Sequence, residues 1–182
     1  IAALKKRIPN DARVLVTYGG GSIKKNGIYD QVAAALSEHT WFEFSGIEPN
    51  PTYDTLVKSL DIIKENDINF ILAVGGGSVI DGSKFIAAAA LFEGTDESND
   101  PWDIVSKQAR IKNALPLACV LTLPATGSES NIGAVVTRDG NKLAFHNPRV
   151  RPAFAILDPK VTLSLSDRQI SNGVVDAFVH TM

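Results

Sequence analysis

Residues 69–84 read Asn-Phe-Ile-Leu-Ala-Val-Gly-Gly-Gly-Ser-Val-Ile-Asp-Gly-Ser-Lys, and this stretch decides the fold. An apolar run that ends in three glycines predicts a buried strand, a tight turn and the start of a helix. Such a turn suits a phosphate group, because glycines let the backbone come close and the first N–H groups of a helix carry partial positive charge. The stretch therefore predicts a bound nucleotide or another phosphorylated molecule.

The spacing of these glycines differs from two common phosphate-binding motifs. The stretch lacks the G-x-G-x-x-G spacing of the dinucleotide fingerprint. Gly77 and Gly82 enclose four residues as in a P-loop, but Ser83 precedes Lys84, which is the reverse of the P-loop order. A plain strand–helix turn is the alternative, although three glycines exceed what such a turn needs. Asp81, about one turn into the helix, is a candidate acceptor for a hydroxyl group, or it simply stabilises the helix N-terminus.

Strand-like and helix-like segments alternate on both sides of this stretch. We predict strands over Arg13–Tyr18, Trp41–Ser45, Phe70–Val74, Leu117–Thr122 and Phe154–Leu157. Helical spacing of apolar residues predicts helices over residues 28–36, 56–63 and 79–91. This order indicates an α/β protein, with a parallel sheet covered by helices on both faces. A hairpin over residues 133–145 departs from the pattern, because Arg138-Asp139-Gly140-Asn141 is a favourable turn.

A second unit is expected near the C-terminus. Ser166-Asp167-Arg168-Gln169 fits a capping box, and the helical pattern that follows has one candidate break at Asn172-Gly173. We therefore divide the chain into a first domain, residues 1–165, and the beginning of a helical domain, residues 166–182. The sequence starts without Met and stops inside a helical pattern, so we expect a segment of a longer protein.

The composition narrows the class of protein. The 182 residues carry 18 basic and 20 acidic side chains without a long basic tract, which argues against nucleic acid as the main partner. The single cysteine, Cys119, lies in an apolar run and is expected to be a small buried hydrophobe. No apolar stretch approaches the ~18 residues of a membrane helix, and no signal peptide is visible. We expect a cytoplasmic protein without a membrane partner.

A second glycine turn, Gly19-Gly20-Gly21-Ser22, follows the first predicted strand. In dinucleotide folds a carboxylate near a strand end binds the adenosine ribose and selects NAD. Asp30 is the only acid between Val14 and Gln31, whereas two lysines follow the turn at positions 24 and 25. This composition favours a cofactor with a 2′-phosphate, hence NADP. A solvated glycine loop with surface lysines is the alternative.

Two further groups of polar residues are candidates. Residues 122–131, Thr-Leu-Pro-Ala-Thr-Gly-Ser-Glu-Ser-Asn, place hydroxyls and an amide after a buried strand, where open α/β sheets bind ligands. Asp176 and His180 stand four residues apart in a helical segment and so share a face. A carboxylate and an imidazole suit Fe²⁺ or Zn²⁺, although such a pair can equally be a surface ion pair.

Taken in order, these motifs resemble the iron-containing, group III alcohol dehydrogenase family. The resemblance rests on Gly75–Lys84, Thr126-Gly127-Ser128-Glu129 and Asp176–His180, and covers essentially the whole chain. Residues 16–25 and 46–51 resemble its branch of NADP-dependent butanol dehydrogenases and broad-range aldehyde reductases. The family implies a Rossmann-like N-terminal domain and an all-helical C-terminal domain, with the active site between them. The family's opening strand and most of its helical domain have no counterpart here.

The resemblance also implies roles for individual residues. Gly76, Gly77 and Ser78 would hold the cofactor pyrophosphate, and Asp81 would lie near the nicotinamide. The other implied cofactor contacts are Asn50 beside the adenosine, Gly20, Gly21 and Ser22 at the 2′-phosphate, and Thr122, Thr126, Ser128, Asn131 and Lys142. Asp176 and His180 match the first two of four protein ligands of a divalent iron or zinc ion, and the remaining histidines would lie beyond Met182.

The expected activity is hydride transfer between NADP(H) and a small alcohol or aldehyde, in an oxidoreductase that forms a homodimer. We expect the residues printed here to be inactive by themselves, because they carry half of the metal site. Two alternatives stay open: a dehydroquinate-synthase-like lyase of the same architecture, and a nucleotide-binding fragment without catalysis. No side chain is an obvious general base. His146 is a candidate to carry the proton, or it is a surface residue of the hairpin.

Overall fold

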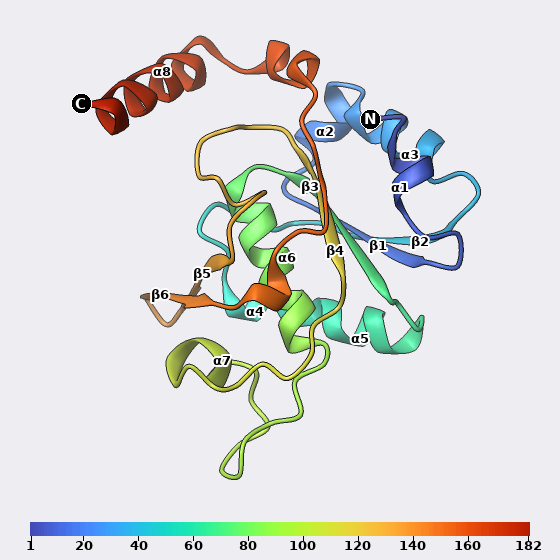
Figure 1. Ribbon diagram of the computed structural model, residues 1–182, viewed down its shortest axis with the longest axis vertical. Coiled ribbons are helices and arrows are strands. Elements are labelled where there is room, and N and C mark those ends of the chain that lie inside the picture. Colours follow the sequence, from blue (N-terminus) through green and yellow to red (C-terminus); the bar gives the residue numbers. More distant parts are fainter.

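A five-stranded parallel sheet forms the centre of the computed structural model, which describes residues 1–182 (Figure 1). Its strands stand in the order β2-β1-β3-β4-β7, and all four pairings are parallel. The strands are β1 (Arg13–Tyr18), β2 (Thr40–Phe44), β3 (Phe70–Gly75), β4 (Leu117–Leu121) and β7 (Ala155–Ile156). Each lies within two residues of its predicted bounds, so the predicted α/β, Rossmann-like class is confirmed.

Helices cover both faces of this sheet, as predicted. Successive strand residues alternate between two separate cores, because side chains along a strand point to opposite faces. Leu15, Ile71 and Cys119 belong to one core, which is covered by α4 (Tyr53–Leu56), α5 (Lys58–Glu65) and α6 (Gly77–Ala89). Val16 and Leu72 belong to the other, covered by α1 (Leu4–Arg7), α2 (Ser22–Lys25) and α3 (Ile28–Ala35). Burial raises the pKa of the Cys119 thiol to about 12, as suits a hydrophobe rather than a nucleophile.

Several local predictions need correction. The helix predicted over residues 56–63 is split at Val57, which ends α4 just before α5 begins. The short helix α7 (Asp103–Ser106) and the 3-10 helices η1 (Pro148–Val150) and η2 (Pro159–Ser164) were not predicted. The capping box of Ser166 and Gln169 is present as predicted, and α8 (Asp167–Thr181) continues through the candidate break at Asn172-Gly173. A glycine inside a helix costs only about 1 kcal/mol, which the capped helix tolerates.

The predicted hairpin consists of β5 (Gly133–Arg138) and β6 (Asn141–His146), paired antiparallel. Asp139 and Gly140 form its turn with φ of 49° and 75°, the left-handed pair that a two-residue hairpin turn of type I′ requires. The hairpin packs against α6 through Ala134, Val136 and Phe145, which are buried in the first core. It thereby places the start of β5 beside the N-terminal half of α6.

Arg138 connects the end of this hairpin to the rest of the domain through an ion pair and a contact with an aromatic ring. Its Nη1 lies 2.7 Å from Asp100 Oδ2, and its guanidinium stands 4.2 Å from the ring centroid of Tyr53. The Tyr53 hydroxyl donates to the other oxygen of Asp100 at 2.5 Å. The Arg138 side chain is 29% exposed, so this cluster is only partly screened by water.

Replacing Arg138 with methionine should therefore lower the free energy of unfolding by about 1–2 kcal/mol, through loss of the ion pair and the contact with the Tyr53 ring. Asp139→Asn is the matched control, because Asp139 Oδ2 lies 4.0 Å from Arg138 Nε and its side chain is 85% exposed. Asparagine also accepts the left-handed backbone there. Urea unfolding should separate the two variants; equal losses would show that the cluster contributes nothing.

Candidate functional site

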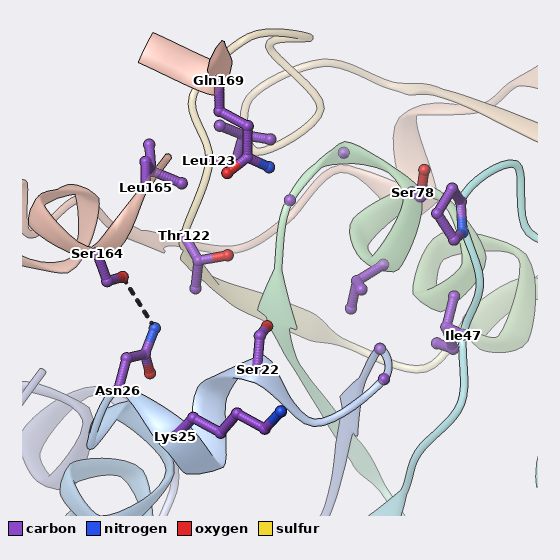
Figure 2. A pocket seen from close by; sticks show the side chains of 16 residues that line it. Ser22, Lys25, Asn26, Ile47, Ser78, Thr122, Leu123, Ser164, Leu165 and Gln169 are labelled. Carbon is purple, nitrogen blue, oxygen red and sulfur yellow. Dashed lines mark hydrogen bonds between the residues drawn. The ribbon is translucent and has the colours of Figure 1, made fainter. Parts of the chain in front are cut away.

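A cleft of about 660 Å³ opens at the carboxyl ends of β1, β3 and β4 (Figure 2). The chain leaves β1 toward β2 on one side, and after β3 it continues to β4 and β7 on the other. The cleft therefore lies where the strand order reverses, which is where open α/β sheets bind ligands. Asn26 Nδ2 donates to Ser164 Oγ at 3.1 Å and brings the end of η2 over the cleft. Its lining is Gly19, Gly20, Ser22, Lys25, Asn26, Ile47, Pro49, Gly76, Gly77, Ser78, Val79, Thr122, Leu123, Ser164, Leu165 and Gln169.

Packing inside the chain explains the glycines at the start of α6. A Cβ added at Gly75 would stand 2.6 Å from Cβ of Val79, and one at Gly77 would stand 2.5 Å from Oγ1 of Thr126. These glycines let the helix begin tightly against β3 and let Thr126 touch its first turn. The plain strand–turn–helix interpretation is thus part of the explanation, while the helix N-terminus still faces the cleft.

The glycines after β1 have a different character. A Cβ at Gly20 or at Gly21 would meet nothing within 4 Å, and only Gly21, with φ of 92°, has a left-handed backbone. Neither packing nor a left-handed backbone in this chain therefore requires glycine at position 20. A glycine without such a reason is suited to a position where a ligand approaches the backbone.

A second cavity of about 390 Å³ lies between α6 and the hairpin, and Gly77 and Ser78 line both cavities. Of the thirteen residues predicted to contact the cofactor, all but Gly21 line one cavity or the other. The second cavity holds the predicted residues Asn50, Gly77, Ser78, Asp81, Thr126, Ser128, Asn131 and Lys142, together with His146. The structure brings these positions from five separate segments into one continuous site.

Asp81 presents a carboxylate to this second cavity. Its Oδ2 accepts from the N–H of Val135 at 3.1 Å, while its Oδ1 is buried without a hydrogen-bond partner. Burial raises the pKa of Asp81, and the hydrogen bond from the Val135 N–H opposes this shift. An unpaired buried carboxylate oxygen at a cavity fits the acceptor role for a ligand hydroxyl that was predicted for Asp81.

The sequence alone presents Lys84 as a displaced P-loop lysine, and the structure gives this residue another role. Its side chain is completely buried, and Nζ donates to the backbone O and side-chain Oδ1 of Asn131 at 3.0 and 2.7 Å and to Gly133 O at 2.7 Å. Burial lowers the pKa of Lys84 to about 8. The sequence does carry one signal for this role, a lysine inside the apolar core-facing run of α6.

Asn131 and Lys142 are oriented by these and neighbouring contacts. Asn131 Oδ1 also accepts from the N–H of Gly133 at 3.1 Å, so the free group of this side chain is its amide NH₂. Lys142 Nζ donates to Asn50 Oδ1 at 2.8 Å, and the Asn50 N–H donates to Ser78 Oγ at 3.4 Å. The second cavity therefore offers amide and ammonium donors beside one unpaired carboxylate oxygen.

The candidate metal pair lies on α8, which extends away from the sheet and has no buried residue (Figure 1). Asp176 Oδ1 and His180 Nε2 are 3.6 Å apart, with side chains 53% and 77% exposed. Both line a third cavity of about 560 Å³, together with Leu123–Thr126, Gln169, Asn172 and Gly173. Leu123 also lines the first cleft and Thr126 the second cavity, so the metal pair adjoins the candidate cofactor site.

The two side chains fit one divalent ion as a partial ligand set. Two donors bound tetrahedrally to Zn²⁺ at ~2.0–2.2 Å stand about 3.4 Å apart, close to the separation found here. No group of three or more His, Cys, Asp or Glu side chains in this chain is placed so that it could hold a metal ion. Asp176 and His180 can therefore supply two ligands of a site but not a complete structural site.

The fold and the site together define a class of protein. It is an α/β protein with a doubly wound parallel sheet, and its cleft lies where the strand order reverses, between two glycine turns. The chain belongs to the iron-containing alcohol dehydrogenase family, whose family model matches residues 1–159, which confirms the resemblance. It is 57% identical over its whole length to the NADPH-dependent aldehyde reductase YqhD of Escherichia coli and covers 47% of that protein. The crystal structure of E. coli YqhD superposes with a TM-score of 0.91 over 99% of this chain and 46% of that one.

Other relatives differ in the cofactor that their names give. The chain is 51% identical to NADP-dependent alcohol dehydrogenase 3 of Entamoeba histolytica, over 95% of this chain and 45% of that protein. It is 44% identical to NADH-dependent butanol dehydrogenase A of Clostridium acetobutylicum, over 93% of this chain and 43% of that protein. The chain thus spans about half the length of the curated relatives it matches. None of its helices has the length and apolar character needed to cross a membrane.

Proposed function

We propose that these residues form the cofactor-binding part of an NADP(H)-dependent oxidoreductase that interconverts small alcohols and aldehydes. The observation that carries the proposal is the cleft at the switch point, which is edged by two glycine turns and lined by no acidic residue. A dinucleotide with three phosphate groups needs an acid-free surface of this kind. Family membership and the names of the NADPH- and NADP-dependent relatives support the same cofactor.

The cofactor would occupy both adjoining cavities, with a different part of it in each. Backbone N–H groups at Gly76, Gly77 and Ser78 would hold the pyrophosphate at the N-terminus of the 13-residue helix α6. The unpaired oxygen of Asp81 and the ammonium group of Lys142 would hold hydroxyl and amide groups of the nicotinamide half in the second cavity. Asn50, which the resemblance implied beside the adenosine, is bonded to Lys142 in this same cavity and would then contact the nicotinamide half instead. This arrangement directs the reactive end of the cofactor toward Thr126, which also borders the metal pair.

Asp176 and His180 would hold a divalent ion, Fe²⁺ or Zn²⁺, with ligands that these residues do not include. When bound, such an ion supplies Lewis acidity that stabilises negative charge on the substrate oxygen. The position of the pair beside Leu123–Thr126 supports this role, because the substrate would then lie between the metal ligands and the nicotinamide half of the cofactor. Metal analysis of the complete protein would distinguish iron from zinc.

The rival lyase activity is disfavoured by the charge around the metal pair. An acidic, phosphorylated substrate would need lysine or arginine near the metal, and the third cavity has neither among its lining residues. A nucleotide-binding fragment without catalysis is distinguished by assay. The complete protein, loaded with Fe²⁺ or Zn²⁺, should oxidise NADPH in the presence of butanal, and chelation should stop it. Folded, metal-loaded protein without turnover would contradict the proposal.

Gly20→Ala tests the cofactor assignment independently of activity. The added methyl group has open space in this chain, so the free energy of unfolding should change by less than about 0.5 kcal/mol. If the cofactor backbone passes Gly20 closely, the same methyl group should weaken NADPH binding about 10-fold or more. Titration of NADPH fluorescence and urea unfolding measure the two effects. Unchanged affinity would place the cofactor elsewhere.

A further inference from the structure

The charge of the first cleft comes from a single side chain. Among its sixteen lining residues Lys25 is the only charged one, and it makes no hydrogen bond or ion pair within the chain. Lys25 stands on α2 with Ser22, and Figure 2 shows both side chains at the same border of the cleft. The cleft therefore offers one free ammonium group beside one hydroxyl and an open glycine backbone, a donor set for an anionic ligand.

Lys24, its neighbour in the sequence, is engaged elsewhere. Its Nζ lies 3.2 Å from Glu43 Oε2 and stands 4.5 Å from the ring centroid of Tyr29 and 5.2 Å from that of Tyr18. The pKa of Lys24 is raised above its ordinary value, first by Tyr18 and then by Glu43. Adjacent residues on a helix point about 100° apart, which explains why one lysine faces the cleft and the other faces β2.

The negative charge of the Glu43 carboxylate interacts with two tyrosines as well as with Lys24. The hydroxyl groups of Tyr18 and Tyr29 both donate to its carboxylate. Although burial opposes ionisation, these hydrogen bonds and Lys24 hold the pKa of Glu43 below its ordinary value. Its carboxylate is thus ionised and enclosed by three donors on β1, α2 and α3. These contacts keep the Lys24 ammonium group beside Glu43, on the side of α2 away from the cleft.

We propose that Lys25 is the side chain that selects a cofactor carrying a 2′-phosphate, and that Glu43, Tyr18 and Tyr29 hold Lys24 out of the cleft. The inference rests on the proposed function and deepens it, because membership of the family leaves the choice between NADPH and NADH open. The 2′-phosphate is a phosphate monoester with a charge of roughly −1.5 to −2 near pH 7. Lys25, with the Ser22 hydroxyl, forms charge-assisted hydrogen bonds to it that NADH cannot make.

The test compares Lys25→Met with Lys24→Met in the complete protein. The probes are NADPH, NADH, adenosine 2′,5′-bisphosphate and AMP, with binding measured by calorimetry at two salt concentrations. Lys25→Met should weaken binding of NADPH and of the bisphosphate about 10- to 100-fold while changing the NADH affinity less than about twofold. It should also reduce the salt dependence of NADPH binding. Lys24→Met, the matched control, should change every affinity less than about threefold.

The possible outcomes distinguish a failure of the role proposed for Lys25 from a failure of the proposed function. Wild-type protein that binds neither dinucleotide would overturn the proposed function itself. Wild-type protein that prefers NADPH, with the preference unchanged in Lys25→Met or lost in Lys24→Met, would overturn only the role of Lys25. Lys25→Arg keeps the charge and should retain most of the preference, whereas Lys25→Gln should lose it. Lys25 is exposed, so circular dichroism and the unfolding midpoint should match wild type in all three variants.

Discussion

Replacing Asp176 with alanine should lower turnover of butanal with NADPH about 100- to 1,000-fold and should release most of the bound divalent metal. The carboxylate would be one of the ligands of the ion, and the ion's stabilisation of charge on the substrate oxygen is lost with it. The loss should not reflect unfolding, because the Asp176 side chain is 53% exposed on a helix without buried residues. Metal content by elemental analysis and steady-state kinetics measure the two effects.

The control for this prediction is Asp167→Ala on the same helix. Asp167 lies in the first turn of α8, outside the cavity that Asp176 and His180 line. Loss of its interaction with the helix N-terminus should cost about 0.3–1 kcal/mol and leave the metal content unchanged. NADPH affinity should also stay within about threefold in Asp176→Ala, because Asp176 does not line the first cleft. Full metal occupancy with undiminished turnover in Asp176→Ala would exclude a ligand role.

The parts of the fold that could be predicted are those set by local sequence. The apolar runs of β3 and β4 are buried over their whole length, so their strands were recognisable without any partner. The hairpin turn at Asp139-Gly140 was predictable for the same reason, since its backbone requires residues that accept positive φ. Both predictions depend on a few consecutive residues, and both are confirmed.

What the sequence could not show is which distant groups meet. Arg138 and Tyr53 bind different oxygens of Asp100, yet the three residues are far apart in the chain and no sequence pattern links them. Lys24 and Lys25 look equivalent in the sequence, and only the packing of Glu43 and two tyrosines separates their roles. Gly77 looked like a ligand-binding glycine, and the structure shows that contact with Thr126 also requires it. Tertiary contact decides each of these cases.

Lys84→Met should have the largest effect on the candidate cofactor site among residues that line neither of its two cavities. The substitution leaves the backbone oxygens of Asn131 and Gly133 without their ammonium donor, so the free energy of unfolding should fall by about 2–4 kcal/mol. It also removes the hydrogen bonds that hold Asn131 and Gly133 in place. The same segment orients the Val135 N–H, which donates to Asp81. NADPH affinity should therefore fall about 10-fold or more, as measured by fluorescence titration.

Ser83→Ala is the matched control for position and burial. Ser83 is fully buried beside Lys84, but its hydroxyl bonds to Thr17 and to the Val79 carbonyl rather than to the segment at Asn131. This variant should lose about 1 kcal/mol of stability and keep its NADPH affinity. Equal losses of affinity in the two variants would show that stability alone, and not the contacts of Lys84, supports the cofactor site.

The charge state of Lys84 should also be visible in how the free energy of unfolding changes with pH. Burial lowers its pKa to about 8, whereas in the unfolded chain a lysine titrates near 10.4. Between these two values the unfolded state binds the additional proton, so the stability of the wild type should rise with pH through this window. Relative to Lys84→Met, the wild type should gain up to about 3 kcal/mol between pH 8 and pH 10.5, because each pKa unit corresponds to about 1.4 kcal/mol. Parallel stability curves for the two proteins would mean that the ammonium group of Lys84 carries no desolvation cost.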